Sequence, residues 1–203
     1  MKTASMTALA AVLAASLAAG CAGPSARVKA EDEGTLVDVR KAGTETYKTL
    51  IRRGVEELLA ENKIQLENAA KKPLIAFVGV ENKSSEELGE FRAAMDTEIT
   101  TALVNSRIYS MISMRAVDAA KRASNIRTVD DLSTAGPREA FKSVLNKDGQ
   151  APEYLLFGEC TTMTSSGNKA KERTYQLTLQ LMDSSSGVIQ SQKLVEISKE
   201  YTK

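Results

Sequence analysis

Leu74-Ile75-Ala76-Phe77-Val78-Gly79-Val80 is a continuous apolar run, and Pro73 precedes it. A short apolar run bounded by turn residues is typical of a strand that is buried on both faces. We therefore expect this segment to lie inside a sheet, with other parts of the chain covering it on either side.

Helical periodicity flanks this strand. Before it, apolar residues recur at helical spacing after Thr46, which is a possible N-cap: Leu50, Ile51, Val55, Leu58 and Leu59. After it, Ser84-Ser85-Glu86-Glu87 has the pattern of a capping box, in which the Ser84 hydroxyl and the Glu87 carboxylate bind free backbone amides reciprocally. The helix expected there ends at Asn105 and carries one apolar stripe: Leu88, Phe91, Met95, Ile99, Ala102 and Leu103.

Strands and helices continue to follow one another in the second half of the chain. We expect a strand over residues 108–114, a helix over 115–124, a helix start at Thr128-Val129-Asp130-Asp131 and a helix opened by Gly136-Pro137. Further strands are expected over 154–164, 175–183 and 188–198, joined by turns at Gly167-Asn168 and Ser184-Ser185-Ser186-Gly187. In the middle one, leucines alternate with Gln176, Thr178 and Gln180. One face of the sheet there contacts water, which favours antiparallel pairing.

The expected fold class is α/β (α+β), with a single mixed, partly antiparallel sheet and helices packed on it. The element order is α-β-α-β-α-α-β-β-β. We place one globular domain at residues 44–203. Residues 21–43 are small, polar and charged, as expected of a flexible tether, although Thr35–Val39 could pair as a short strand.

The first 20 residues have the pattern of a secretory signal. Lys2 is followed by an uncharged Ala/Leu run over residues 8–19, which is too short to span a bilayer stably. Cys21 directly follows Gly20, and this order resembles a lipoprotein signal. We therefore expect cleavage between Gly20 and Cys21, and lipid on the sulfur and on the new amino group of Cys21. The alternative is an ordinary secreted protein in which Cys21 is incidental.

Composition excludes several classes of function. The chain has 27 Lys and Arg residues, 26 Asp and Glu residues, and no histidine. This balance gives no electrostatic reason to expect a nucleic-acid partner. Without histidine the chain lacks every His-based triad and most zinc, copper and non-haem iron sites, so we expect no metal or other cofactor. With Cys21 acylated, Cys160 is the one remaining thiol, and no internal disulfide can form.

A few residues match patterns that carry chemistry elsewhere. Ser166-Gly167-Asn168-Lys169 has the Ser-x-x-Lys spacing of some serine hydrolases. It falls at an expected hairpin tip, and the companion motifs of those enzymes are missing, so we interpret the match as coincidental. Cys160 has no expected activator, so we interpret it as a small buried residue. Asn82-Lys83-Ser84 fits a glycosylation acceptor, which has no bearing in a bacterial context.

Two groups of charged residues complete the candidates. Two pairs of neighbouring carboxylates lie at expected helix starts: Glu86-Glu87 and Asp130-Asp131. The helix dipole stabilises negative charge at these positions, so we favour a structural role for both pairs over an acid/base role. Lys169, Lys171 and Arg173 form a basic hairpin tip that either contacts an anionic polymer or is simply solvated, and we favour the second. No catalytic residue is expected, and hence neither an enzyme nor a small-molecule substrate.

The order of several segments resembles the lipoprotein activators of penicillin-binding proteins, the LpoB type. The resemblance covers about residues 48–198 and rests on LIAFVGVENKSSEEL, SMISMRAVDAAKRASN, EYLLFG and YQLTLQLMDSSSGVIQSQ. The same fold group is similar to the N-terminal domain of the TolB translocation protein and to the curli-secretion lipoprotein. Typical LpoB members have a long Pro/Gln-rich tether, whereas here about 22 residues follow Cys21, which span at most about 75 Å.

The resemblance implies a function without catalysis. The domain would bind a bifunctional peptidoglycan synthase and stimulate it from the outer membrane, facing the periplasm, with Cys21 as the membrane anchor. Ala22 agrees with that address because it is not the aspartate that retains lipoproteins at the inner membrane. Two alternatives stay open: an oligomeric assembly lipoprotein of a secretion-type envelope complex, and an enzyme of a kind that the motifs do not reveal.

Overall fold

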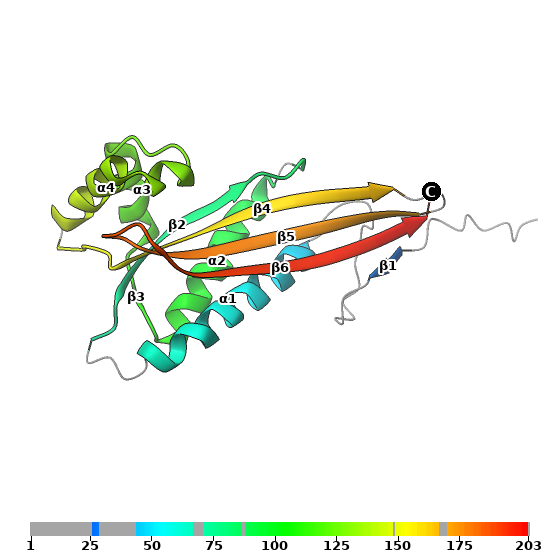
Figure 1. The fold of residues 1–203 in the computed structure, drawn as a ribbon, viewed down its shortest axis with the longest axis horizontal. Coiled ribbons are helices and arrows are strands. Elements are labelled where there is room, and N and C mark those ends of the chain that lie inside the picture. The colour runs from blue at the N-terminus through cyan, green and yellow to red at the C-terminus, as the bar shows by residue number, and fades with distance from the viewer. Residues whose placement is uncertain are drawn as a thin grey trace, which may run out of the picture.

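The computed structural model describes residues 26–28, 44–66, 71–86, 88–147, 149–166 and 170–202. In chain order its elements are β1 (Ala26–Val28), α1 (Thr44–Leu66), β2 (Leu74–Asn82), α2 (Glu90–Ser106), β3 (Ser110–Met111), α3 (Met114–Ala123), the 3-10 helix η1 (Val129–Ser133), α4 (Ala135–Lys147), β4 (Tyr154–Ser166), β5 (Ala170–Asp183) and β6 (Ile189–Thr202). Its strands form one sheet in the order β1-β6-β5-β4-β2-β3 (Figure 1). β2 pairs in parallel with β3 and β4, and the remaining pairs are antiparallel. The expected mixed sheet is confirmed.

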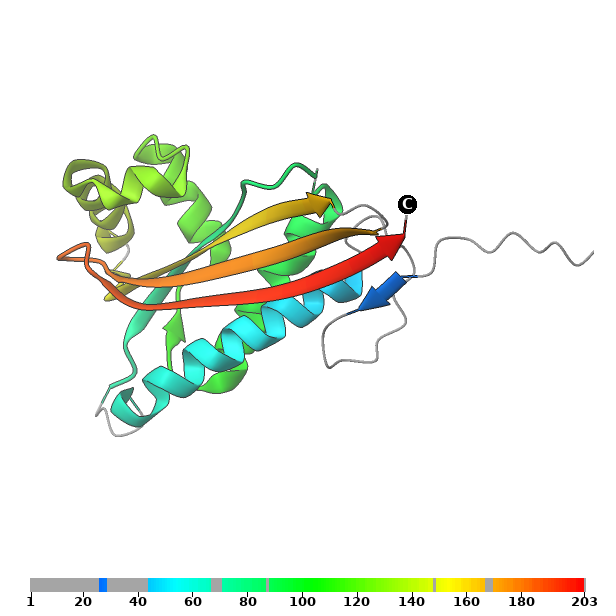
Figure 2. The ribbon, with the colours of Figure 1, turned by 45° about the vertical axis from the view of Figure 1, so that its right-hand side comes forward.

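Helices cover the two faces of this sheet unequally. α1 packs on β5, β6 and α2 along one face, whereas α3 packs on β2 and α4 on the other. Figures 1 and 2 show α3 and α4 gathered at one end, while β4, β5 and β6 extend beyond them to the opposite end. None of the described helices therefore lies over the far part of the second face.

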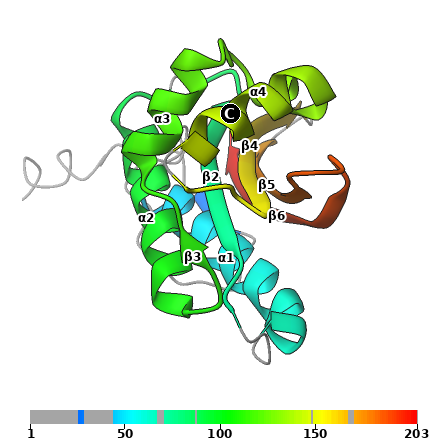
Figure 3. The ribbon, with the colours of Figure 1, turned by 90° about the vertical axis from the view of Figure 1, so that its left-hand side faces the viewer.

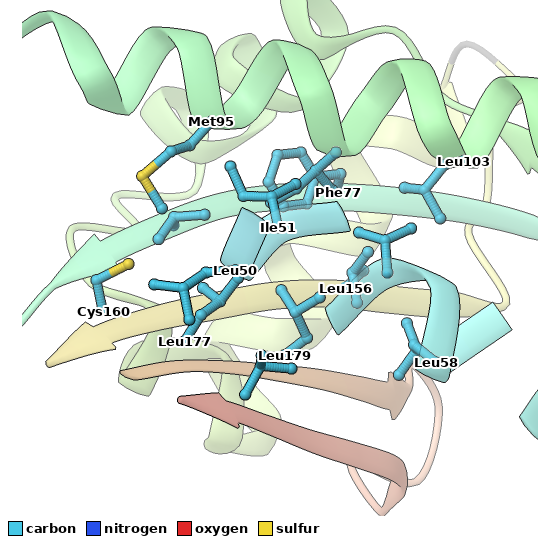
Figure 4. Close-up of a cluster of buried hydrophobic side chains, with 14 of the residues drawn as sticks. Leu50, Ile51, Leu58, Phe77, Met95, Leu103, Leu156, Cys160, Leu177 and Leu179 are labelled. Carbon is cyan, nitrogen blue, oxygen red and sulfur yellow. The ribbon is translucent and has the colours of Figure 1, made fainter. Parts of the chain in front are cut away.

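The larger core lies between α1, α2 and the sheet (Figure 4). The leucines that alternate along β5 are buried in it, as the sequence predicts, and Leu177 and Leu179 have no exposed surface. Gly54 lets α1 approach them closely, because a β-carbon there would lie 3.2 Å from Leu179 Cδ1. Apolar burial of this kind is the main favourable contribution to folding.

β2 supplies side chains to both cores. Ile75 and Phe77 belong to the larger core, and Ala76 and Val78 to a smaller one under α3, η1 and α4. A β-bulge between Phe77 and Gly79 then inserts one extra residue, and Gly79 adopts a φ of +122°, which few other residues tolerate. The bulge reverses the alternation, so that Val80 also lies in the larger core.

Several expected element boundaries are wrong for local reasons. α1 begins at Thr44, so Thr46 lies inside its first turn and is not the N-cap. α2 follows Gly89 and has no side-chain cap, so the expected capping box at Ser84 does not form. The Ser84 hydroxyl donates instead to Asn82 Oδ1 at 2.6 Å, a local turn that competes with helix capping. The expected partner Glu87 lies outside the described residues.

Other boundaries shift by smaller amounts. α2 ends at Ser106 instead of Asn105, with Arg107 in the left-handed conformation as its C-cap. The strand expected over 108–114 shrinks to β3, which lies beside the first part of β2 (Figure 3). The strand β1 was not predicted: it falls in the expected tether and pairs with β6, whereas Thr35–Val39 lies outside the described residues.

The turn between β5 and β6 matches its prediction. Asp183 N–H donates to Val188 O at 2.9 Å, and Gly187 has a φ of +75°. A β-carbon on Gly187 would lie 2.5 Å from Nη1 of the buried Arg138, so glycine is needed both for conformation and for space. The other expected turn, at Gly167-Asn168, lies outside the described residues.

The two faces of β5 generate a matched pair of substitutions. Leu179→Asp places an unpaired carboxylate where no surface is exposed, which costs several kcal/mol against a total stability of about 5–15 kcal/mol. Gln180 lies on the opposite face, half-buried, with its amide donating to Gln192 Oε1 at 2.7 Å. We expect Leu179→Asp to unfold the domain and Gln180→Asp to change its melting temperature by a few degrees. Equal melting temperatures would contradict this assignment of faces.

Candidate interaction surfaces

Of the residues that the sequence singled out for chemistry, the structure brings Glu86 together with Arg173 in an ion pair. Gly20 and Cys21 lie outside the described residues, as do Gly167, Asn168 and Lys169, and Ser166 is exposed at the end of β4. Within the described ranges, no three acidic or cysteine side chains are grouped so that they could hold a metal ion. In the same ranges no helix has the length and apolar character needed to cross a bilayer.

Cys160 is a buried residue of the larger core, as predicted. Only 2% of its surface is exposed. Burial raises the pKa of the Cys160 thiol to about 12, with the charge of Asp96 as a second cause. A thiol with this pKa is protonated at physiological pH, so Cys160 is an unreactive packing residue.

Glu86 and Arg173 form a partly buried ion pair between the loop after β2 and strand β5. Glu86 Oε1 lies 3.0 Å from Arg173 Nη2 and accepts a hydrogen bond from Tyr175 Oη at 3.2 Å. The Arg173 guanidinium also lies 5.8 Å from the centre of the Tyr175 ring and donates to Ser85 Oγ. Arg173 therefore fastens the loop to the sheet, and the expectation that it belongs to a solvated basic tip is wrong. Lys171 is half-buried.

The other candidate polar residues also serve local structure. Asp131 accepts backbone N–H bonds from Thr128 and Arg127 at 2.9 and 2.8 Å, which lower its pKa and confirm the predicted helix start. Its neighbour Asp130 is exposed and lies 3.5 Å from Lys83 Nζ. The Asn82 amide donates to Glu86 O at 2.7 Å and closes the turn after β2. None of these contacts forms an acid/base pair.

The outer edge of β2 is covered by two charged side chains. β3 and the residue after it pair only with the start of β2, where Ile112 N–H donates to Ile75 O at 2.9 Å. Further along, Lys121 Nζ donates to Val78 O at 3.0 Å, and Asp96 Oδ1 accepts from Val80 N–H at 3.3 Å. Burial lowers the pKa of Lys121 and raises that of Asp96. These side chains bond backbone groups at an edge that β3 does not reach.

Sequence reasoning did not single out Asp96 or Lys121. Their partners are backbone groups of β2, so no side-chain pattern links them, and Gly79 was the one sign of an irregularity there. A hollow of about 230 Å³ lies beside Lys121, and its charged lining has both signs: Glu81, Arg92, Lys121 and Arg127. A mixed lining of this kind does not define one class of small ligand.

Beyond α3 and α4, one face of β4, β5 and β6 carries none of the described helices (Figure 1). We call it the open sheet face, and it consists of Thr161, Met163, Thr174, Gln176, Thr178, Gln180, Gln192, Leu194, Glu196 and Ser198. Side-chain bonds cross it from strand to strand, including Thr161 to Gln176 at 2.9 Å and Thr174 to Ser198 at 2.8 Å. Met163 and Leu194 are 54% and 52% exposed within it.

This arrangement suits contact with another macromolecule. Hydrogen-bonded polar side chains form a regular surface. The apolar side chains of Met163 and Leu194 project from it, and about half of each is exposed to solvent. Protein interfaces combine a few apolar anchors with a polar surround. The fold is thus a small α+β domain with a half-covered sheet, and its open sheet face is a candidate interaction surface.

The chain belongs to the peptidoglycan-synthase activator LpoB family, whose family model matches residues 47–197. Members of this family are activators of synthases and not themselves enzymes. No curated protein sequence matches the chain.

Solved structures that resemble this chain include family members. The LpoB C-terminal domain from Salmonella enterica is 17% identical, with a TM-score of 0.49, over 74% of this chain and 96% of that one. The Escherichia coli LpoB C-terminal domain is 16% identical, with a TM-score of 0.49, over 72% and 96%. A lipoprotein from Neisseria meningitidis is 18% identical, with a TM-score of 0.45, over 62% and 82%.

The edge contacts of β2 give a prediction that depends on pH. Asp96→Ala leaves Val80 N–H without its acceptor and should cost about 1–3 kcal/mol of the free energy of unfolding. Asp96→Asn keeps an acceptor oxygen and removes the buried charge, so at pH 7 it should be at least as stable as the native chain.

The sign of the pH dependence follows from the raised pKa of Asp96. The stabilising contribution of its protonated form is present at low pH and is lost as the pH rises through the folded-state pKa. In urea denaturation, any excess in the free energy of unfolding of Asp96→Asn over the native chain should therefore shrink as the pH falls from 7 towards 4. If Asp96→Asn is as unstable as Asp96→Ala at pH 7, the Asp96 charge itself stabilises the fold.

Proposed function

We propose that this chain is an outer-membrane lipoprotein that binds a bifunctional penicillin-binding protein in the periplasm and stimulates its polymerising and cross-linking activities. The observation that carries the proposal is the family match, which spans almost the whole of the described globular part. The signal sequence and Cys21 supply the anchor, and Ala22 supports the outer membrane as the address.

We infer that activation works through binding alone. The chain has no histidine, and its described cysteine is buried and protonated. A binding protein can shift a partner towards an active state only if it has higher affinity for that state. The domain must therefore contact the synthase over a surface that distinguishes its conformations.

The open sheet face is our candidate for that surface. It is accessible along the parts of β4, β5 and β6 beyond α3 and α4, and it presents Leu194 as a projecting apolar side chain. The opposite face of the sheet is occupied by α1 and α2. Val104 on α2 is 56% exposed and gives a matched apolar residue away from the candidate surface.

Anchoring by Cys21 can be tested directly. Radiolabelled palmitate should enter the native lipoprotein in growing cells and should not enter Cys21→Ser. Cys160 remains in both chains and serves as an internal control, because its burial keeps it from acylation. Equal labelling of the two chains would rule out Cys21 as the acylated residue.

Activation can be tested with purified proteins. A chain that lacks residues 1–20 and carries Cys21→Ser should raise glycan polymerisation by a bifunctional synthase of the same organism, saturably and without activity of its own. Leu194→Glu should weaken this stimulation at least tenfold, whereas Val104→Glu should leave it unchanged. Equal effects of the two variants would exclude the open sheet face as the binding surface.

A negative result would favour the assembly alternative. If the chain neither binds nor stimulates any synthase of its host, and the native lipoprotein instead purifies as a ring or with a secretion complex, then the activator assignment is wrong for this family member.

A further inference from the structure

β1 attaches the beginning of the chain to one end of the sheet. Ala26 lies opposite Tyr201 and Val28 opposite Lys199, on the outer edge of β6 (Figure 2). β6 ends there beside the start of β5, where Ala170 pairs with Thr202. α3 and α4 lie at the opposite end of the sheet (Figure 1).

The position of β1 in the sequence gives this pairing a mechanical consequence. Ala26 is the fifth residue after Cys21, and five residues span at most about 18 Å. The 22 residues from Ala22 to Gly43 could span about 75 Å when none of them is bound to the domain. When β1 pairs with β6, the distance that the chain can span between Cys21 and the domain is therefore reduced from about 75 Å to about 18 Å.

We propose that β1 is a clasp that sets how far the domain reaches from the membrane. The proposal depends on the lipid anchor at Cys21 included in the proposed function. With the clasp closed, the end of the sheet formed by Ser166, Ala170 and Thr202 is held near the bilayer, and α3 and α4 point away from it. With the clasp open, the domain moves outward on the full tether.

The contacts of β6 allow β1 to detach while the rest of the sheet stays folded. Its inner edge stays paired with β5 as far as Ala170 and Thr202, independently of β1. Its core-facing Lys199 is only 1% exposed and lies 5.3 Å from the centre of the Tyr175 ring. The end of β6 is therefore held by contacts that β1 does not make.

The clasp is also short enough to be reversible. Three paired residues gain a few backbone hydrogen bonds, and that gain is similar in size to the entropy lost when three residues are ordered. Both states should therefore be populated, and a pull on the tether would favour the open one. An outer-membrane protein with a short tether needs such an open state to approach a partner across the periplasm.

A locked and a released variant test the proposal. Arg27 and Glu200 are directly opposite in the register, and β-carbons of such pairs are about 4.5–5.5 Å apart, within reach of a disulfide after slight adjustment. Arg27→Cys/Glu200→Cys should close the clasp on oxidation. Arg27→Pro/Val28→Pro should open it, because the N–H groups of neighbouring strand residues point to opposite edges and one of the two prolines therefore removes a donor to β6. Arg27→Ala/Val28→Ala is the matched control.

The readout is distance from the bilayer and does not involve a synthase. Full-length lipoprotein is placed in phosphatidylethanolamine/phosphatidylglycerol vesicles, with an acceptor dye on the lipid headgroups and a donor dye introduced by a non-cysteine method at Ser185. Ser185 is exposed in the turn between β5 and β6. Arg27→Pro/Val28→Pro should change energy transfer at least twofold from the locked chain, with a broader distance distribution. Reduction of the disulfide should restore the native value.

The outcomes separate the two proposals. Identical energy transfer from locked, reduced and Arg27→Pro/Val28→Pro chains would show that β1 does not control reach, whatever the synthase assay gives. A loss of all energy transfer in Cys21→Ser confirms the anchor that the clasp requires, whereas unchanged transfer overturns both the anchor and the clasp. Failure of synthase stimulation with a working clasp would overturn the activator assignment alone.

Discussion

Burial of β2 on both faces is the constraint on which the rest of the structure depends. Its side chains enter two separate cores, and its backbone must find hydrogen-bond partners along both edges. β4 covers one edge along most of its length. The other edge receives only the short β3, so α2 and α3 must lie close enough for Asp96 and Lys121 to bond the backbone beyond it.

That requirement also explains the unequal covering of the sheet. α3, η1 and α4 enclose the smaller core over β2 and the first residues of β4. β4, β5 and β6 continue past this core, with mostly polar side chains on the face that none of the described helices covers. The outer strands can therefore present a binding surface while the inner ones hold the fold, and the Glu86–Arg173 ion pair connects the two regions.

Sequence reasoning predicted the parts of the fold that local patterns encode. The apolar run of β2 and the alternation of Leu177 and Leu179 determine burial directly, and both are as expected. The capping box at Ser84 failed because Asn82 offers the same hydroxyl a nearer partner. β1 was missed because three residues carry no periodicity and their pairing depends on a strand more than 170 positions away. The open sheet face depends on where α3 and α4 end in space, which no local pattern shows.

The bulge at Gly79 places one extra residue in β2 without changing the faces that the following side chains occupy. One residue fewer between Phe77 and Val80 would restore simple alternation and leave Val80 opposite Gly158, still facing the larger core. Regular pairing without that deletion would instead turn Val80 away from the larger core and bring the carboxylate of Glu81 towards it. In an alignment of relatives, a gap of one residue should therefore be tolerated here, and members that lack the extra residue should not need a glycine at this position.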